Sequence, residues 1–177
     1  DDVETIHANF EREFGIPFED FRALDLIGTQ NDSAEAIYNP EKYLLYCDPF
    51  MGQFDNRVKS GDAAGYADCA ARLAVYADHA EYGYLFRSLR ALCAFLSVKA
   101  DLGIRTRAAY LSGNKTAAKA LCTDYDAALE RLDAFYAAYE QQWMHENKPQ
   151  GFDVVDLRIG GQRQRLLHCR DRLLAYA

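Results

Sequence analysis

The densest group of side chains able to do chemistry lies between Trp143 and Lys148. An indole, a carboxylate, an amide and an ammonium stand close together there, on Trp143, Glu146, Asn147 and Lys148. An aromatic plane with hydrogen-bonding groups beside it suits a ligand that has an apolar face and several hydroxyls, as a sugar ring has. The alternative is an ordinary helix end, where the Lys148 ammonium interacts favourably with the helix dipole and Glu146 pairs with an arginine such as Arg158. The residues alone leave both interpretations open.

A second candidate group lies around an Asp-Pro turn in the first third of the chain. Tyr43 and Tyr46 precede this turn, which starts at Asp48. The chain has 12 tyrosines, and most of them, such as Tyr66 and Tyr125, fall on apolar stripes expected to form a core. Tyr43 and Tyr46 are less constrained. We therefore keep them, with Asp48, as candidate contacts for a sugar pocket or an interface.

Other kinds of catalytic site find no support in the sequence. No serine stands in a Gly-x-Ser-x-Gly frame, and no glycine-rich phosphate loop is present. Gly160 and Gly161 form a lone pair, which inside a helix permits close packing or interrupts the helix. No His-x-x-x-His spacing links the four histidines, which are His7, His79, His145 and His168. We expect no metal site and no cofactor.

The five cysteines are scattered along apolar helical stretches, without a Cys-x-x-Cys pair. An odd, scattered set of this kind indicates reduced thiols that are buried as small apolar side chains. This usage predicts a cytoplasmic protein. The cysteines are Cys47, Cys69, Cys93, Cys122 and Cys169.

Arginines are frequent near the C-terminal end of the chain. They are Arg158, Arg163, Arg165, Arg170 and Arg172. A basic stripe of this kind could bind an anionic ligand. Because Asp153, Asp156 and Asp171 alternate with these arginines, we favour a solvated or salt-bridged helix face.

Helical periodicity predicts the elements that position these residues. The clearest is a long amphipathic helix of about six turns, in which apolar residues recur at steps of three and four. Its stripe consists of Leu121, Tyr125, Ala128, Leu132, Phe135, Tyr139 and Trp143. A Lys-Pro-Gln-Gly break at residues 148–151 ends this helix, and a final helix follows. Residues 152–157 alternate as a strand could, but the segment is too short to assign.

The remaining helices are shorter. The first ends at Gly15, and the second ends near Gly28. Residues 29–39 are polar and predict a loop. Asn39 then caps a brief helix that begins at Pro40 and stops before the Asp-Pro turn.

Three more segments complete the pattern. Ser60 is a candidate cap for a helix, and Gly83 marks a break or bend after it. An apolar stripe runs over residues 85–102 and ends at Gly103. A further turn or two covers residues 104–111.

Together these patterns predict an all-α bundle of about six helices around one long central helix. We expect a single helical domain over residues 1–177, with an irregular N-terminal part in residues 1–58 and the main bundle in residues 60–177. At 177 residues the chain is too short for a (β/α)₈ barrel, which needs at least about 200.

Charge and hydropathy argue against nucleic acid and membranes as partners. The chain has 20 Lys and Arg against 27 Asp and Glu, a net charge of −7, which disfavours binding to nucleic acid or anionic lipid. The sequence has no apolar run of about 18 residues, and its start has no basic segment followed by an apolar one. We therefore expect neither a membrane span nor a signal peptide. The missing initial methionine suggests a piece cut from a longer protein.

Three separated motifs carry a resemblance to a known family. They occupy residues 39–55, residues 102–110 and residues 143–161, with sequences that include NPEKYLLYCDPFMG, LGIRTRAAY and WMHENKPQG. The chain resembles the C-terminal helical domain of bacterial family-twenty glycoside hydrolases, the exo-β-N-acetylglucosaminidases, along almost its whole length.

The resemblance implies a catalytic (β/α)₈ barrel as the partner of this domain. In that family an adjacent Asp-Glu pair removes terminal β-linked N-acetylhexosamine, with the substrate's own acetamido group as nucleophile. No Asp-Glu dipeptide occurs in this sequence, so no catalytic residue is carried over and we expect the chain alone to hydrolyse nothing. The resemblance leaves the domain the roles of supporting the barrel, mediating a homodimer and helping to close the sugar pocket.

Two other functions stay open at this stage. A helical protein-interaction module would expose an apolar face after the bundle has closed. A separate carbohydrate-binding module would bind N-acetylglucosamine without the barrel.

Overall fold

The structure, a computed structural model, describes residues 2–29 and 39–177. Every regular element in these residues is a helix, which confirms the predicted all-α bundle. The predicted loop of residues 29–39 lies almost entirely outside the described residues.

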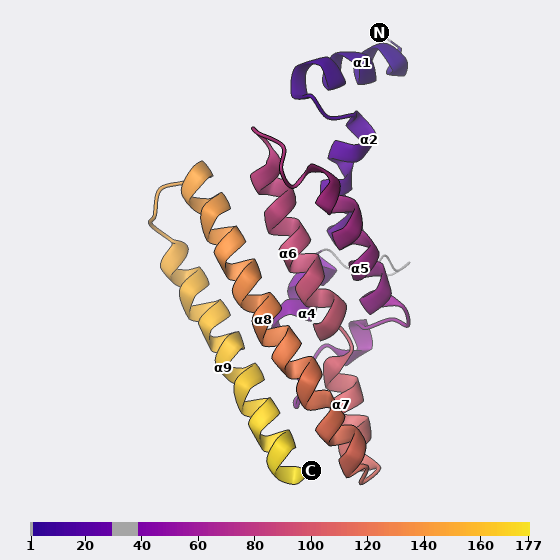
Figure 1. Ribbon diagram of the computed structural model, residues 1–177, viewed down its shortest axis with the longest axis vertical. Helices are drawn as coiled ribbons and strands as arrows, with labels where there is room; N and C mark the ends of the chain where they lie inside the picture. The colour runs from indigo at the N-terminus through magenta and orange to yellow at the C-terminus, as the bar shows by residue number, and fades with distance from the viewer. Residues whose placement is uncertain (1, 30–38) are drawn as a thin grey trace.

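Four helices run along the length of the molecule and form its main layer (Figure 1). In space α5 packs on α6, α6 on α8, and α8 on α9, while the shorter α7 packs on α8 at the end where the C-terminus lies. The bounds of these helices, with α7 included, are α5 (Asp62–Leu73), α6 (Gly83–Lys99), α7 (Leu102–Leu111), α8 (Lys115–Glu146) and α9 (Phe152–Tyr176).

The predicted long helix is confirmed as α8, which has 32 residues. It begins after Asn114, whose side chain accepts a hydrogen bond of 2.9 Å from the backbone N–H of Ala117. Its stripe side chains Tyr125 and Leu132 are fully buried. The apolar face of α8 therefore lies between α6 and α9, as steps of three and four require.

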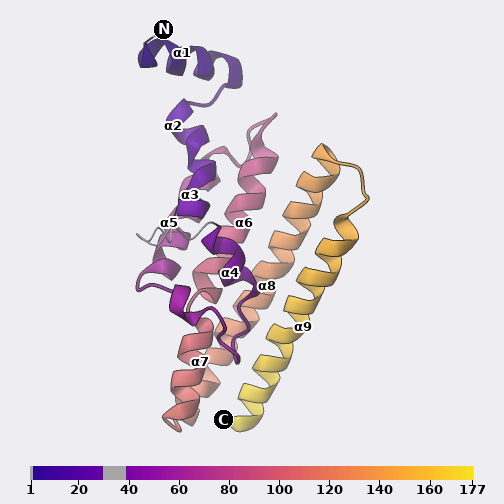
Figure 2. The ribbon, with the colours of Figure 1, turned by 180° about the vertical axis from the view of Figure 1, so that it is seen from behind.

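The N-terminal part consists of short helices. The α-helices are α1 (Val3–Phe14), α2 (Phe18–Phe21), α3 (Leu26–Thr29) and α4 (Pro40–Tyr46), and the 3₁₀ turns are η1 (Arg22–Asp25) and η2 (Asp55–Arg57). Another 3₁₀ turn, η3 (Ala74–Tyr76), follows α5 in the main bundle. Helix α1 projects from the end of the bundle opposite the C-terminus (Figure 1). Helix α4 lies across α6, on the face seen in Figure 2, with α8 and α9 beside it.

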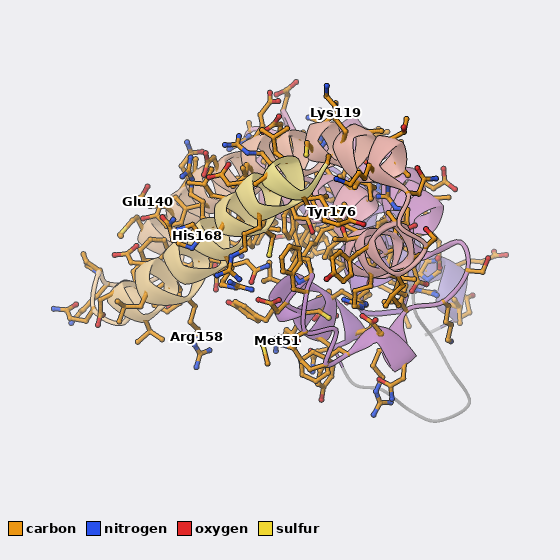
Figure 3. All side chains as sticks on the ribbon, turned by 90° about the horizontal axis from the view of Figure 1, so that it is seen from below. Met51, Lys119, Glu140, Arg158, His168 and Tyr176 are labelled. Carbon is orange, nitrogen blue, oxygen red and sulfur yellow. The ribbon has the colours of Figure 1, made fainter. Side chains whose placement is uncertain are left out.

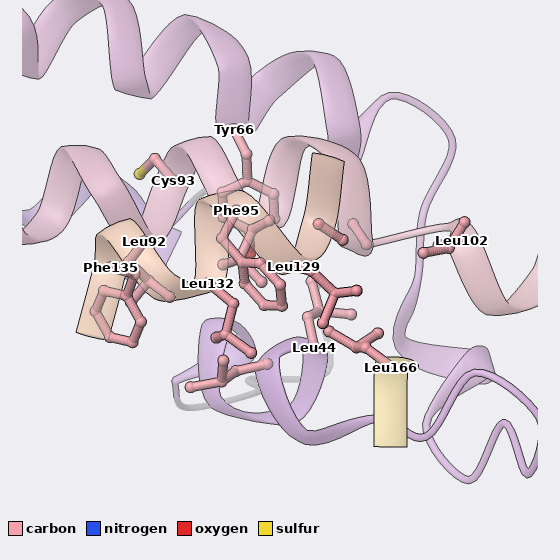
Figure 4. Close-up of a cluster of buried hydrophobic side chains, with 14 of the residues drawn as sticks. Leu44, Tyr66, Leu92, Cys93, Phe95, Leu102, Leu129, Leu132, Phe135 and Leu166 are labelled. Carbon is pink, nitrogen blue, oxygen red and sulfur yellow. The ribbon is translucent and has the colours of Figure 1, made fainter. Parts of the chain in front are cut away.

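One core joins the two parts of the chain (Figure 4). Each of five elements places a side chain of at most 1% exposure in it: Leu44 of α4, Tyr66 of α5, Phe95 of α6, Leu132 of α8 and Leu166 of α9. Burial of such apolar surface is the main stabilising contribution to a bundle. Helix α4 is thus an integral part of the core, although it belongs to the segment that the sequence marks as irregular.

Two predicted helix boundaries are wrong. Helix α5 begins at Asp62 after Gly61, so Ser60 is not its cap; the Asp62 carboxylate accepts a 2.7 Å hydrogen bond from the Lys59 N–H instead. Gly103 lies inside α7, near its start, and does not end the preceding stripe. A Cβ at Gly103 would lie 3.0 Å from the Pro49 Cα, so this glycine allows the Asp-Pro turn to rest against α7.

Residues 152–157, which alternate as a strand could, form the first turns of α9. The helix starts after Gly151, whose φ of 95° suits a residue without a side chain. Gly160 and Gly161 lie within α9 without interrupting it, and an added Cβ at either one meets no atom within 4 Å. The five cysteines form no disulfide with one another, and all but Cys122 are buried.

Candidate functional site

Trp143 is half-buried at the turn that joins α8 to α9. Its ring lies 5.8 Å from that of Phe152 and 6.3 Å from that of Tyr139, measured between ring centroids. The indole N–H donates a 2.9 Å hydrogen bond to the backbone oxygen of Lys148. These contacts hold the end of α8 against the start of α9, which is the helix-end interpretation for Trp143.

Glu146 pairs with tyrosine and glutamine. The Tyr84 hydroxyl donates to its carboxylate at 3.1 Å, and the Gln142 amide donates at 3.3 Å. Burial and then this bond to Glu146 raise the pKa of Tyr84. The ion pair of Glu146 with an arginine such as Arg158, part of the helix-end interpretation, is not among the ion pairs that the described residues form. Asn147 ends α8, and its N–H donates to the Trp143 oxygen at 2.8 Å.

Asp48 organises the Asp-Pro turn from the inside. One carboxylate oxygen accepts from the N–H groups of Phe50 at 2.8 Å and Met51 at 3.0 Å, and the other accepts from the Arg165 guanidinium at 2.6 Å. Burial alone would raise the pKa of Asp48, but these donors hold it below its usual value. Asp48 is 8% exposed, so its visible role is to hold the turn.

Two further cations fix the same turn. Arg107 donates to the Pro49 oxygen and pairs with the Asp55 carboxylate. Lys99 donates to the Cys47 oxygen at 2.6 Å. The turn over residues 47–55, which we call the Asp48 turn, is thus tied to α6, α7 and α9.

The Asp48 turn presents apolar side chains to the outside. Met51 is 76% exposed, and Tyr43 is 39% exposed on the adjoining face of α4. The Tyr43 ring meets the Phe54 ring edge-on at 5.0 Å. Met51 and Arg158 extend on the same side of the molecule (Figure 3). A firmly anchored turn with exposed apolar tips is typical of a contact surface.

Of the seven candidate residues, Tyr46 alone lines the groove between α4, α6, α8 and α9. Tyr46 of α4 lines it from one side, and Tyr139 and Gln142 of α8 line it from another. Its volume is about 360 Å³, in the range of small-molecule sites. Trp143 and Asp48 belong to separate clusters at different heights of the bundle, so the seven candidate residues do not form one site.

The arginines of α9 mostly form ion pairs, as the sequence favours. Arg163 pairs with Asp133, Arg165 with Asp48, and Arg170 with Asp126 and Asp171. Within residues 2–29 and 39–177 no three His, Cys, Asp or Glu residues lie close enough together to hold a metal ion. No helix of this described part has the length and apolar character needed to cross a membrane.

Comparison with known families decides between the remaining interpretations. The model of the glycoside hydrolase 20C C-terminal domain matches residues 17–177. The chain belongs to this family. No curated protein matches the sequence.

Membership in the glycoside hydrolase 20C C-terminal domain family implies a catalytic domain as partner. The matched residues contain all three sequence motifs and every candidate site residue, but they leave out α1. In this glycoside hydrolase domain the motif around residues 39–55 builds α4 and the Asp48 turn, and the motif around residues 102–110 builds the helix that supports that turn.

Sequence reasoning missed the residues that anchor the Asp48 turn in this domain. Lys99, Arg107 and Arg165 lie 52, 58 and 117 residues from their partners in the turn. The sequence contains one sign of the role of Lys99, its position beside the apolar stripe of α6. A lysine that is buried there needs polar partners. Nothing in the sequence indicates the contacts of Arg107 and Arg165, because neither spacing nor composition links them to the Asp48 turn.

Proposed function

We propose that this domain is the C-terminal helical part of an exo-acting β-N-acetylhexosaminidase, an enzyme that removes terminal β-linked N-acetylglucosamine by substrate-assisted hydrolysis. The family match over residues 17–177 carries this proposal. In it the barrel of the parent enzyme performs the chemistry, because the chain contains no Asp-Glu pair. The 177 residues then act as one helical domain that supports the barrel.

The Asp48 turn is the part of the domain best suited to reach another surface. Lys99 and Arg107 bind backbone oxygens of the turn and Arg165 binds the Asp48 carboxylate, so the backbone that carries Met51 is held in place. A preorganised backbone loses less entropy on binding. We assign to Met51 and Tyr43 the contact that closes the sugar pocket or joins two subunits into a homodimer. Trp143, Glu146, Asn147 and Lys148 stay candidate contacts in this proposal, and Trp143 in addition holds the α8–α9 turn.

In this proposal the parent enzyme is cytoplasmic, which the five thiols support, because cysteines stay reduced in that compartment.

The decisive experiment uses the full-length enzyme and two matched methionine variants. Met51→Ala removes an exposed tip of the Asp48 turn, and Met144→Ala removes an exposed methionine near the end of α8. KM and kcat for a chromogenic β-N-acetylglucosaminide are measured, together with the mass in solution by light scattering. We expect Met51→Ala and Tyr43→Ala to raise KM or to dissociate the dimer, and Met144→Ala to do neither.

If Met51→Ala and Tyr43→Ala both leave KM, kcat and the mass in solution unchanged, Met51 and Tyr43 do not make the proposed contact. The purified chain without the barrel should release no aglycone. Release above the blank would contradict the division of labour between barrel and helical domain.

A further inference from the structure

A pocket lies at the end of the bundle where the C-terminus is found, the end that Figure 3 looks onto. Its lining comes from Phe50 of the Asp48 turn, from residues between 106 and 110 of α7 and from residues between 172 and 176 of α9. All of these belong to the described part of the chain. We call it the end pocket. Its volume is about 360 Å³, in the range of small-molecule sites.

The walls of the end pocket are mostly aromatic and aliphatic. Phe50, Tyr110 and Tyr176 bring a ring each, and Leu173, which is 3% exposed, adds an aliphatic surface. The rings of Tyr110 and Tyr176 lie 4.9 Å apart between their centroids, at 55° to each other. Tyr110 is 58% exposed. These rings therefore offer a flat apolar ligand a surface to pack on.

The charged side chains that line the end pocket are all cationic. They are Arg107 and Arg172, and no carboxylate stands among the lining residues. A third cation is close, because the Lys115 ammonium lies 5.3 Å from the centre of the Tyr176 ring. The chain as a whole has a net charge of −7, so this positive group stands out against the rest of the molecule. Its charge complements an anion.

The two arginines differ in what they are already bound to. Arg107 donates to the Pro49 oxygen and pairs with the Asp55 carboxylate, so the fold uses its charge. Arg172 is exposed and forms no ion pair with another described residue. The charge that an incoming anion would meet is therefore that of Arg172.

The neighbours of Arg172 on α9 do not neutralise it. The Asp171 carboxylate pairs with Arg170, and the terminal carboxylate of Ala177 forms no ion pair with a described residue. Water satisfies an ordinary exposed guanidinium, so exposure alone carries no site. Here the guanidinium borders an aromatic pocket, and its planar fork of donors matches a carboxylate at two points.

The lining also decides against a neutral sugar. It contains no Asp, Glu, Asn or Gln side chain. The Thr106 hydroxyl is engaged, since it donates to the Leu102 oxygen at 2.7 Å and lies 3.0 Å from the Tyr125 hydroxyl. The many hydroxyl donors of a sugar would find few acceptors there.

We propose that the end pocket binds a small organic anion with a flat apolar body, of the class of aromatic carboxylates. The carboxylate of the ligand accepts from the Arg172 guanidinium, and its ring lies against Tyr110 and Tyr176. This site is independent of the glycosidase assignment.

The experiment compares 2-naphthoate with 2-naphthalenemethanol, a neutral alcohol on the same ring system, as probes of the 177-residue chain. Each is titrated against isotope-labelled protein, and the amide shifts of residues lining the end pocket are followed by NMR. We expect saturable shifts there, with an affinity at least about tenfold higher for naphthoate than for the alcohol. Because salt screens charge, raising it from about 20 to about 500 mM should weaken the binding of naphthoate and not that of the alcohol.

Three variants at exposed positions separate charge from packing. Arg172→Gln should weaken naphthoate binding about tenfold and leave alcohol binding unchanged. Tyr110→Ala removes a wall and should weaken the binding of both probes. Lys119→Gln is the matched control for charge, at an exposed lysine of α8 that points away from Tyr176 (Figure 3), and should change neither affinity.

Alcohol binding also reports whether Arg172→Gln keeps the pocket. Equal affinity for the two probes, no saturable binding, or shifts confined to other parts of the chain would each overturn the proposal. So would an undiminished affinity for naphthoate in Arg172→Gln, or an equal loss in Lys119→Gln. N-acetylglucosamine is the third probe, and saturable shifts at the end pocket with this neutral sugar would contradict the assigned ligand class.

Discussion

Lys99 shows how one buried charge ties distant segments together. It is 2% exposed, and its ammonium donates to the Leu44 oxygen at 3.1 Å and to the Cys47 oxygen at 2.6 Å. These carbonyls lie at the C-terminal end of α4, where backbone oxygens lack helical partners. Lys99 therefore caps α4 from within α6 and starts the Asp48 turn at a fixed place.

Burial lowers the pKa of Lys99 from 10.5 to about 8, against the opposing effects of Cys47, Asp48 and Cys169 nearby. Between these two values the unfolded chain holds a proton that the folded chain has released. The contribution of Lys99 to the free energy of unfolding therefore rises with pH across this window, by up to roughly 3 kcal/mol. It is smallest below pH 8, where the charged amine is buried.

The measurement is urea unfolding of the wild type and of Lys99→Met at several pH values between 7.5 and about 10. Subtraction removes the titration of the tyrosines and thiols that the two proteins share. We expect the wild type to gain stability relative to the variant as pH rises. A difference that stays constant or falls would show that Lys99 keeps an ordinary pKa in the fold.

At the scale of the element, the Asp48 turn depends on a partly buried carboxylate, whereas other ion pairs of α9 are superficial. The side chains of Asp48 and Arg165 are 11% and 40% exposed, and those of Asp133 and Arg163 are 50% and 48% exposed. Asp48 also satisfies two backbone N–H groups of the turn. Removal of this carboxylate would take the acceptor from three partly buried donors, the Phe50 and Met51 N–H groups and the Arg165 guanidinium.

We expect Asp48→Ala to lower the free energy of unfolding by about 2–3 kcal/mol. Asp133→Ala, which breaks the exposed pair between Asp133 of α8 and Arg163 of α9, should lower it by less than about 1 kcal/mol. Both values come from urea unfolding at pH 7. Similar losses in the two variants would mean that the hydrogen bonds of the Asp48 turn add little to the stability of the bundle.

The sequence predicts a helix well where the periodic apolar pattern extends over many residues. It predicts poorly where contacts with residues distant in the sequence determine the local structure. Steps of three and four over more than 20 residues identify α8, because no other regular structure repeats them. Residues 152–157 are ambiguous in isolation, and their helix follows from packing of Phe152 and Ile159 on the core. In the sequence Gly103 looks like a residue that ends a helix. In the fold a glycine is needed there because Pro49 packs closely against its backbone.

The same limit explains the candidate site. The residue types near Trp143 suit a sugar site, but their roles depend on Phe152 and Tyr84, which approach only in the fold. Glu41 and Ser88 have no sequence signal at all. Each looks like an ordinary helical residue, and only the fold shows that both line one groove and that the Glu41 Oε2 and the Ser88 Oγ have no hydrogen-bond partner among the described residues.

The whole molecule combines a continuous core with one weakly attached end. Helix α1 contains no buried residue, and the family match begins after it. Its main attachment is aromatic: the rings of Phe10 and Phe14 lie 5.3 and 5.7 Å from that of Phe21. By contrast, α9 carries several core side chains, including Ile159, Leu166 and Leu173, packed against α8 and the rest of the core.

This contrast predicts different outcomes for two truncations of the chain. Deletion of residues 2–15 removes partly exposed rings, so we expect a loss of at most about 3 kcal/mol and a single cooperative transition in urea. Deletion of residues 152–177 exposes one side of α8 and should abolish that transition. Circular dichroism followed against urea concentration distinguishes the two. If the first deletion broadened or split the transition, α1 would be part of the folding unit, and the bundle of residues 17–177 would not be the autonomous domain that its core describes.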